Sequence, residues 1–326
     1  MLNTPLVSAN MDTITEFEMA IALAREGGIG IIHRFMTIED QVEQVLKVKR
    51  SESVVIEQPY TIKSTLTVDD ANKSMNEYGI SGLIVEDEEK KLAGIITRRD
   101  ITFEKDRTLK VCKLMSKDVI TAHSGITTEE AKEILHKHRI EKLPVIDENR
   151  NIVGLITSKD ILKMEKYPHA SKDRKGRLLV GAAVGVKGDF LERTESLLEA
   201  GADTIVVDIA HGHSDNALNA VHLIKKAFPM CELIAGNVAT GEGARDLIKA
   251  GVDAVKVGVG SGSICITRVV TGSGVPQLTA VIDSVKVAAE YNIPVISDGG
   301  IRTSGDATKA LAAGASTVMV GSLLGG

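Results

Sequence analysis

Eight short runs rich in Val, Ile and Ala alternate with amphipathic helical stretches over residues 1–58 and 167–326, and this alternation is the strongest constraint on the fold. Most of the runs are continuous apolar segments, which is typical of parallel strands buried on both faces. The pattern therefore predicts strand–helix units joined by right-handed crossovers. The expected strands are residues 5–8, 29–33, 178–184, 204–207, 232–235, 254–257, 295–297 and 317–320.

Three of the expected junctions between a helix and the next strand have the same form. They are Ala200-Gly201-Ala202-Asp203, Ala250-Gly251-Val252-Asp253 and Ala313-Gly314-Ala315-Ser316. In each, a Gly stands just past the helix, where a left-handed backbone costs least for a residue without Cβ. The recurrence indicates that one structural unit repeats along the chain.

Eight strands in this pattern predict an α/β fold, a (β/α)8 TIM barrel, and the two segments together approach the ~250 residues typical of it. An open doubly wound sheet is the main alternative, and it is disfavoured because no early GxGxxG opens a helix after the first strand. No helical pattern follows the expected strand at 317–320 before Gly326. The final helix of the barrel is therefore expected to be absent, as in a fragment or trimmed chain.

Residues 59–166 contain an internal repeat with an offset of 60 and no gap. Residues 92–101 match residues 152–161 best, and Gly94 and Gly154 occupy equivalent positions. We expect an α+β domain, with repeats at about 59–110 and 115–166, inserted into a barrel made of 1–58 and 167–326. Two units of this size that each bury one face should pack against one another.

This repeat resembles a tandem pair of cystathionine-β-synthase (CBS) modules, a Bateman domain. The resemblance rests on two Thr-x-x-Asp motifs, Thr97/Asp100 and Thr157/Asp160. It implies that these side chains bind the ribose of a regulatory purine nucleotide, since a carboxylate accepts hydrogen bonds from vicinal hydroxyls well. The alternative is that the same residues only cap the helices that follow them.

Composition excludes several classes of protein. The net charge of −5 argues against a broad basic surface for nucleic acid, and an aromatic platform for stacked bases is not expected from nine aromatics without Trp. No apolar run approaches the ~18 residues of a membrane span, and the start is not a signal peptide. Three cysteines without a CxxC pair suit a reducing compartment. We expect a cytoplasmic location, with no nucleic-acid or membrane partner.

A glycine-rich loop at residues 258–268 gives the strongest local signal for chemistry. It directly follows an expected strand, so it lies at the carboxyl ends of the strands, where barrel enzymes carry their active sites. Cys265 stands among Gly, Ser and Thr, as a nucleophile would, although an incidental loop thiol is the alternative. Cys112 and Cys231 have apolar neighbours and are expected to fill space in the core or at the surface. We predict Cys265 to be a catalytic nucleophile.

Two further loops are expected at the same end of the barrel. Asp298-Gly299-Gly300 follows the seventh expected strand and Gly321-Ser322 follows the eighth. Loops in these two positions commonly bind phosphate through backbone N–H groups. Asp298 can then reach hydroxyls beside that phosphate, so the loops predict a site for a ribose 5′-phosphate near the cysteine.

Several motifs of the chain resemble those of the IMP dehydrogenases. The motifs are Gly-Ser-Gly-Ser-Ile-Cys-Ile-Thr at 260–267, Gly-Val-Pro-Gln at 274–277, Asp-Gly-Gly-Ile at 298–301 and Met-Val-Gly-Ser-Leu-Leu at 319–324. Met-Asp-Thr at 11–13 and Gly-Gly-Ile-Gly-Ile-Ile-His at 27–33 match as well. The Bateman insertion follows the second strand, where that family carries it, and the match covers essentially the whole chain.

The resemblance implies NAD-dependent oxidation of IMP to XMP, in guanine nucleotide biosynthesis, through a covalent intermediate on Cys265. Thr267 would assist hydrolysis, and backbone carbonyls of Gly260, Gly262 and Cys265 would bind potassium, as carbonyl dipoles can replace its hydration shell. Asp208, which ends the fourth strand, and Asn237, in the Gly236-Asn237 pair after the fifth, would lie on the NAD side. The implied substrate residues are Met11, Ser263, Ile264, Asp298, Gly299, Gly300, Met319, Gly321 and Ser322, and the implied cofactor residues are Asp208, Asn237, Gly258 and Gly260.

Several alternatives stay open. A GMP reductase uses a similar barrel and cysteine, and a nucleotide-sensing barrel without turnover is a second class. Asp208-x-x-His211-Gly212-His213 has a spacing that could bind a transition metal, although a polar loop beside the cofactor explains it too. The resemblance also implies a homotetramer, regulation by purine nucleotides, and a catalytic flap beyond residue 326 that completes hydrolysis. Without that flap, the chain is expected to bind nucleotides but to complete turnover poorly.

Overall fold

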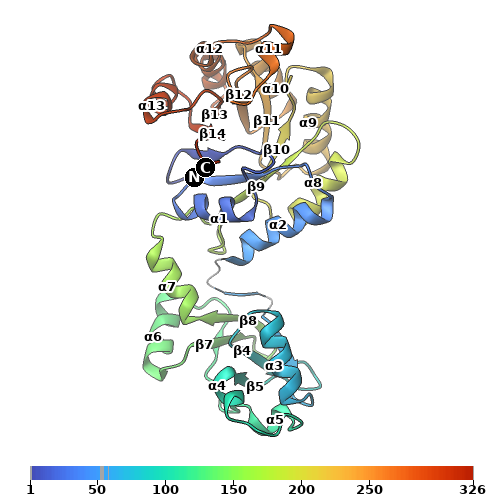
Figure 1. The fold of residues 1–326 in the computed structure, drawn as a ribbon, viewed down its shortest axis with the longest axis vertical. Coiled ribbons are helices and arrows are strands. Elements are labelled where there is room, and N and C mark those ends of the chain that lie inside the picture. The colour runs from blue at the N-terminus through green and yellow to red at the C-terminus, as the bar shows by residue number, and fades with distance from the viewer. Residues whose placement is uncertain (1, 52–54, 58, 326) are drawn as a thin grey trace. The chain divides into compact units, whose positions relative to one another are not determined.

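The chain divides into two compact units. This computed structural model describes residues 2–51, 55–57 and 59–325. One unit comprises Met1–Glu52 and Tyr167–Gly326, and the other comprises Ser53–Lys166 (Figure 1). Residue 58, where the sequence placed the first boundary, lies outside the described residues.

The first unit is a closed barrel of eight parallel strands, so the TIM-barrel prediction is confirmed. Strand order around the barrel is β1-β14-β13-β12-β11-β10-β9-β2, with β2 pairing to β1 to close it. All eight expected strands are present, with small shifts in their ends. Their bounds are β1 Leu6–Ser8, β2 Ile29–Ile32, β9 Val180–Val184, β10 Thr204–Asp208, β11 Leu233–Val238, β12 Ala254–Val257, β13 Val295–Asp298 and β14 Thr317–Val320.

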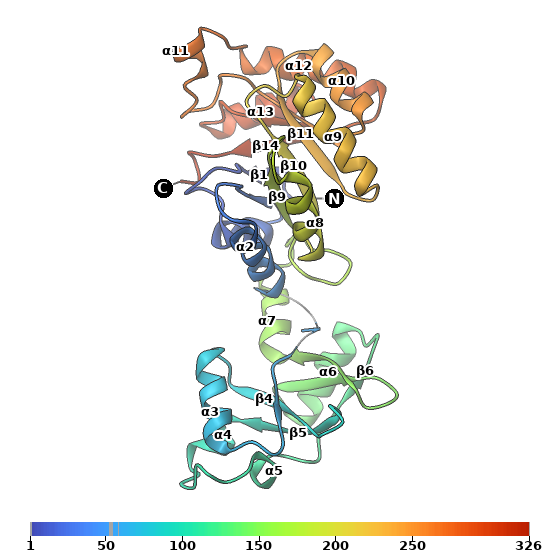
Figure 2. The same cartoon turned by 90° about the vertical axis from the view of Figure 1, so that its right-hand side faces the viewer.

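Helices follow the first seven strands of the barrel and cover its outside, and none follows β14 within the described residues (Figure 2). A large core lies between strands and helices, and a smaller one, containing Val7, Ile31, Ile296 and Met319, fills the barrel interior. Period-two alternation along each strand sends side chains alternately to these two cores. The helices are α1 Phe17–Arg25, α2 Ile38–Ser51, α8 Phe190–Glu199, α9 Asp215–Ala227, α10 Gly241–Ala250, α11 Thr267–Thr271, α12 Gln277–Glu290 and α13 Ser304–Ala312.

The three repeated junctions adopt the predicted backbone. Gly201, Gly251 and Gly314 have φ of 95°, 111° and 102°. Each ends its helix in the left-handed region, where a Cβ would be strained. The residue after each glycine leads into the next strand.

One predicted strand end was wrong. The sequence placed Gly236 and Asn237 after the fifth strand, whereas β11 continues to Val238. Gly236 lies within the sheet, since it pairs with Asp208 on one side and Lys256 on the other. A Cβ at Gly236 would lie 2.2 Å from the Lys256 carbonyl oxygen, so glycine is needed here for close strand approach.

The second unit contains two similar three-stranded sheets, ordered β3-β4-β5 and β6-β7-β8. In each, the first pair is parallel and the second antiparallel, and Val85 pairs with Gly94 as Val145 pairs with Gly154. Ile84, Leu92, Ile146 and Leu155 form a small core shared by the two sheets. The elements are β3 Thr61–Lys63, α3 Val68–Glu77, β4 Gly82–Glu86, β5 Leu92–Thr97, α4 Arg98–Thr102, α5 Val111–Leu114, β6 Ala122–His123, α6 Thr128–His138, β7 Lys142–Ile146, β8 Ile152–Thr157 and α7 Ser158–Lys166.

The sixty-residue offset of the sequence therefore reappears as equivalent strand registers. That this unit is a Bateman domain remains a prediction. Across the described ranges, no helix is both long and apolar enough to cross a membrane.

Candidate active site

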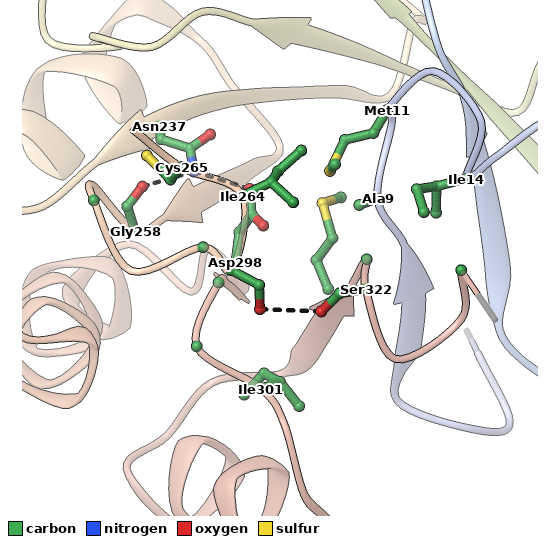
Figure 3. A pocket seen from close by; sticks show the side chains of 18 of the residues that line it. Ala9, Met11, Ile14, Asn237, Gly258, Ile264, Cys265, Asp298, Ile301 and Ser322 are labelled. Carbon is green, nitrogen blue, oxygen red and sulfur yellow. Dashed lines mark hydrogen bonds between the residues drawn. The ribbon is translucent and has the colours of Figure 1, made fainter. Parts of the chain in front are cut away.

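A pocket of about 450 Å³ opens at the carboxyl ends of the barrel strands (Figure 3). Its walls come from loops that are far apart in the sequence: the loop after β1, the cysteine loop after β12, and the loops after β13 and β14. The lining residues include Met11, Asn237, Gly258, Gly260, Gly262, Ser263, Ile264, Cys265, Asp298, Gly299, Gly300, Met319, Gly321 and Ser322. Of the residues that the sequence assigned to chemistry in the barrel, Thr267 and Asp208 lie outside this lining.

Cys265 lies just before helix α11, and its thiol has a polar environment. Its Sγ lies 3.2 Å from Oγ1 of Thr267, so the Thr267 hydroxyl is in hydrogen-bonding contact with the thiol. The pKa of Cys265 is lowered from its ordinary value, first by the Thr267 hydroxyl and further by the backbone N–H groups of Thr267 and Gly260 and the charge of Arg268. A lowered pKa raises the thiolate fraction, and the thiolate is the nucleophilic form.

Cys231 has the opposite environment. It is buried in the core between strands and helices, and burial raises its pKa to about 11. Cys112 lies in helix α5 of the second unit. Among the three thiols, only that of Cys265 lines the pocket.

The cysteine loop contacts both glycine loops of the neighbouring strands. Oγ of Ser322 donates to Oγ of Ser263 at 3.0 Å, which joins the loop after β14 to the cysteine loop. Gly299 has φ of 103°, and a Cβ there would lie 2.5 Å from Oγ of Ser261. Glycine at 299 therefore permits the loop after β13 to lie against the cysteine loop.

Gln277 fixes the base of the cysteine loop, a role that sequence reasoning did not assign. Its Nε2 donates to the carbonyl of Val257 at 2.8 Å and contacts Oγ of Ser297 at 3.0 Å, while its Oε1 accepts from Oγ of Ser261 at 2.7 Å. One amide thus connects the end of β12, strand β13 and the cysteine loop. The Gly-Val-Pro-Gln motif contained the signal, since it ends on this residue.

A buried polar network lies under the pocket. Nδ2 of Asn237 donates to Oδ2 of Asp298 at 2.9 Å and to the carbonyl of Gly258 at 2.7 Å. Nζ of Lys256 donates to Oδ2 of Asp298 at 2.8 Å, to Oδ1 of Asp208 at 3.0 Å and to Oδ1 of Asn237. Asp208, which ends β10, thus connects to the pocket through Lys256, a residue that sequence reasoning took only as part of a strand.

Met11 and Met319 form an apolar wall of the pocket. Met319 is a buried residue of β14, and Met11 lies in the loop after β1. Figure 3 shows Met11 across the pocket from Cys265, Asn237 and Gly258. A flat ligand between these sides would meet sulfur and methyl groups on one side and polar groups on the other.

A family model described as "IMP dehydrogenase / GMP reductase domain" matches residues 1–326. The chain belongs to the IMP dehydrogenase / GMP reductase family. It is 67% identical over 325 residues to an inosine-5′-monophosphate dehydrogenase of Nitrosopumilus maritimus, covering 100% of this chain and 68% of that relative. An inosine-5′-monophosphate dehydrogenase of Aquifex aeolicus is 58% identical over 328 residues, covering 100% of this chain and 67% of the relative.

A solved structure of the same family has a closely similar fold. The GMP reductase of Trypanosoma brucei, in complex with guanosine 5′-triphosphate, superposes with a TM-score of 0.92 at 47% identity, covering 100% of this chain and 79% of that chain. The proteins that this chain resembles are named as dehydrogenases and reductases, so the chain is a member of an enzyme family.

Within this IMP dehydrogenase / GMP reductase barrel, the expected potassium ligands belong to one short loop. The carbonyl of Gly262 accepts the N–H of Cys265 at 3.2 Å, and Gly260 has φ of 80°. Each carbonyl oxygen has two lone pairs, so the hydrogen bond to Gly262 leaves one for a cation. Carbonyl oxygens without a carboxylate are the donors that a monovalent cation takes, and potassium binding by this loop remains a prediction.

The alternative transition-metal motif does not converge. Asp208 binds Lys256, while Nε2 of His213 lies 2.8 Å from Oδ2 of Asp246. Within the described residues, the one cluster of metal-ligating type is Asp12, Glu16 and His33.

In the cluster of Asp12, Glu16 and His33, the histidine is not arranged to ligate a metal. Nδ1 of His33 accepts the N–H of Phe35 at 3.2 Å, so Nε2 carries the proton in the neutral ring. Nε2 lies 3.8 Å from a carboxylate oxygen of Asp12 and 3.8 Å from one of Glu16. A protonated nitrogen cannot ligate a metal.

The predicted regulatory residues lie in the second unit. Asp100 accepts the N–H and the hydroxyl of Thr97, each at 2.7 Å, in a capping box at the start of α4. The Thr157 hydroxyl donates to Asp160 in the same way. The capping alternative is therefore present in the structure, and ribose binding by these residues remains a prediction.

Proposed function

We propose that this chain oxidises IMP to XMP with NAD, using Cys265 as the nucleophile. The main support for this proposal is that one pocket brings together the Cys265 thiol, whose pKa is lowered, and the glycine loops after β13 and β14. The high identity to dehydrogenases over the whole chain supports oxidation of IMP rather than reduction of GMP.

In the first step the Cys265 thiolate forms a bond to C2 of the purine. NAD, when bound, supplies the acceptor for the hydride that leaves C2. Asn237, Gly258 and Gly260 line the pocket beside Cys265, which supports this side for the cofactor. Asp208 reaches the same side through Lys256.

In the second step water adds to C2, the bond to Cys265 breaks, and the thiol is released with XMP. The balance is IMP, NAD⁺ and water giving XMP, NADH and a proton. Thr267, 3.2 Å from the sulfur, can exchange a hydrogen bond with the thiol and with the incoming water.

Substrate binding follows from the pocket walls. Backbone N–H groups at Gly300 and Gly321, with the hydroxyls of Ser263 and Ser322, would bind the 5′-phosphate. Asp298 would accept hydrogen bonds from the ribose hydroxyls, and Gly299 lets the loops meet. Ile264, Met11 and Met319 would contact the base.

Potassium would be held by the carbonyls of Gly260, Gly262 and Cys265, where it would fix the conformation of the cysteine loop. Regulatory purine nucleotides would bind the second unit at Thr97, Asp100, Thr157 and Asp160. A homotetramer and a cytoplasmic location complete the proposal, and both rest on family resemblance and composition.

Reduction of GMP is the second candidate, because the superposed neighbour is a GMP reductase. The test is to mix the protein with IMP and NAD, or with GMP and NADPH, and to follow absorbance of the reduced cofactor. Oxidation of IMP predicts a rise in the first mixture and no fall in the second. Hydride transfer precedes hydrolysis, so a single-turnover burst is sufficient. The opposite pattern would identify a GMP reductase.

A cysteine variant tests the mechanism. Cys265→Ala should abolish the burst while leaving IMP affinity within about threefold, because the sulfur bonds only during chemistry. Cys231→Ala is the matched control and should keep the burst. An undiminished burst in Cys265→Ala would reject the covalent mechanism.

A further inference from the structure

Lys256 is a lysine enclosed within the barrel interior. Its neighbours Val255 and Val257 belong to the core between strands and helices, so alternation along β12 turns the Lys256 side chain inward. Only 2% of the residue is exposed. A buried cation without partners would be strongly destabilising, so its contacts require an explanation.

Its three N–H donors all have acceptors, and each acceptor comes from a different strand. Oδ2 of Asp298 lies 2.8 Å away on β13, Oδ1 of Asp208 lies 3.0 Å away on β10, and Oδ1 of Asn237 on β11 completes the set. An ammonium has three donors, so the geometry saturates it. One atom thus joins three of the polar groups at the base of the pocket.

The charges of this network favour an ionised Lys256 and an ionised Asp208. Burial lowers the pKa of Lys256, but the nearby Asp298 and Asp208 outweigh it and raise the pKa above its ordinary value. Burial likewise raises the pKa of Asp208, but attraction and hydrogen bonding by Lys256, with help from Asn10 and Arg34, lower it overall. Removal of Lys256 would leave two neighbouring carboxylates without their shared cation.

The contacts also leave acceptor capacity toward the pocket. Lys256 and Asn237 both bind Oδ2 of Asp298, and Oδ1 of Asp298 has no protein partner in the part of the chain that the structure describes. Asp298 lines the pocket. Lys256 and Asn237 therefore hold Oδ2 together, which leaves Oδ1 as the carboxylate oxygen that can accept from a ligand.

We propose that Lys256 is a positioning residue that orients Asp298 toward the substrate ribose and ties it to Asp208 on the cofactor side. The identity of the two ligands rests on the proposed function. Because a single ammonium contacts both carboxylates, its loss should disturb substrate affinity and hydride transfer together.

A second buried lysine provides a matched control. Lys49, 3% exposed, donates to Oδ2 of Asp203 at 2.7 Å and Oδ2 of Asp173 at 3.1 Å. Asp203 precedes β10, whereas Asp208 ends it, so the two lysine clusters lie at opposite ends of the barrel. Loss of either cation destabilises the barrel, but only Lys256 is connected to the pocket.

The experiment compares Lys256→Gln, Lys49→Gln and Lys256→Arg by thermal unfolding, by calorimetric titration with IMP, and by the NADH burst at a temperature where all are folded. Lys256→Gln should bind IMP roughly tenfold more weakly and lose ~10²-fold in the rate of the NADH burst at subsaturating IMP, the scale of a misplaced binding group. Lys49→Gln should stay within about threefold in both while its Tm falls. Lys256→Arg keeps the positive charge and should recover most of the burst rate.

The outcomes separate this inference from the proposed function. Equal losses in the two Gln variants, or an Arg variant as impaired as Lys256→Gln, would overturn the positioning role. If the parent protein produces no NADH from IMP but oxidises NADPH with GMP, the proposed function fails. The same three variants, titrated with GMP, then test Lys256 through affinity for a nucleotide with the same ribose.

Discussion

At the residue scale, the thiols of Cys265 and Cys231 differ in the direction in which their surroundings shift the pKa. The hydroxyl and N–H of Thr267 lower the pKa of Cys265, while burial raises that of Cys231 to about 11. At pH 8, iodoacetamide should therefore alkylate Cys265 first and leave Cys231 unmodified, as read by peptide mass spectrometry.

Thr267→Val should raise the pKa of Cys265 and move its alkylation rate profile to higher pH. Thr271→Val on the same helix is the control, and an equal shift in both variants would reject the role of Thr267.

The residue scale also shows what the sequence could and could not predict. Cys265, Asp298 and the glycines were predictable because a loop after a barrel strand exposes such residues at one rim. Lys256 was not, because a lysine inside an apolar strand gives no local sign of its partners. Those partners are Asp208 and Asp298, 48 and 42 residues away, and only closure of the barrel brings them together.

At the element scale, the second unit repeats one device, the Thr-x-x-Asp capping box. Asp70 accepts the N–H and hydroxyl of Thr67 at the start of α3, as Asp100 does with Thr97 at α4. Asp70→Ala and Asp100→Ala should each lower the midpoint of denaturant unfolding slightly, since each removes the carboxylate that accepts the N–H of the N-cap Thr. Only Asp100→Ala should also weaken binding of ATP or GTP. Equal nucleotide affinity in both variants would favour capping alone.

The strands were predictable because they are short continuous apolar runs between amphipathic helical stretches, and three helix–strand junctions share a glycine. The end of β11 was not, because Gly236 has two possible meanings. A glycine can end a strand, or it can allow a neighbouring strand to approach closely. Only the position of Lys256, on the paired strand, decides between them.

At the scale of the whole molecule, the barrel and the second unit have separate cores. We expect two calorimetric unfolding transitions, each responding to its own ligand. IMP at 100 times its Kd stabilises the barrel by about 2.7 kcal/mol, which should raise that transition by about 5–10 °C. ATP or GTP should raise only the other transition. At the same IMP concentration, Asp298→Asn should reduce the shift with IMP and leave the shift with ATP, whereas a single transition that responds equally to both ligands would show that the units unfold as one.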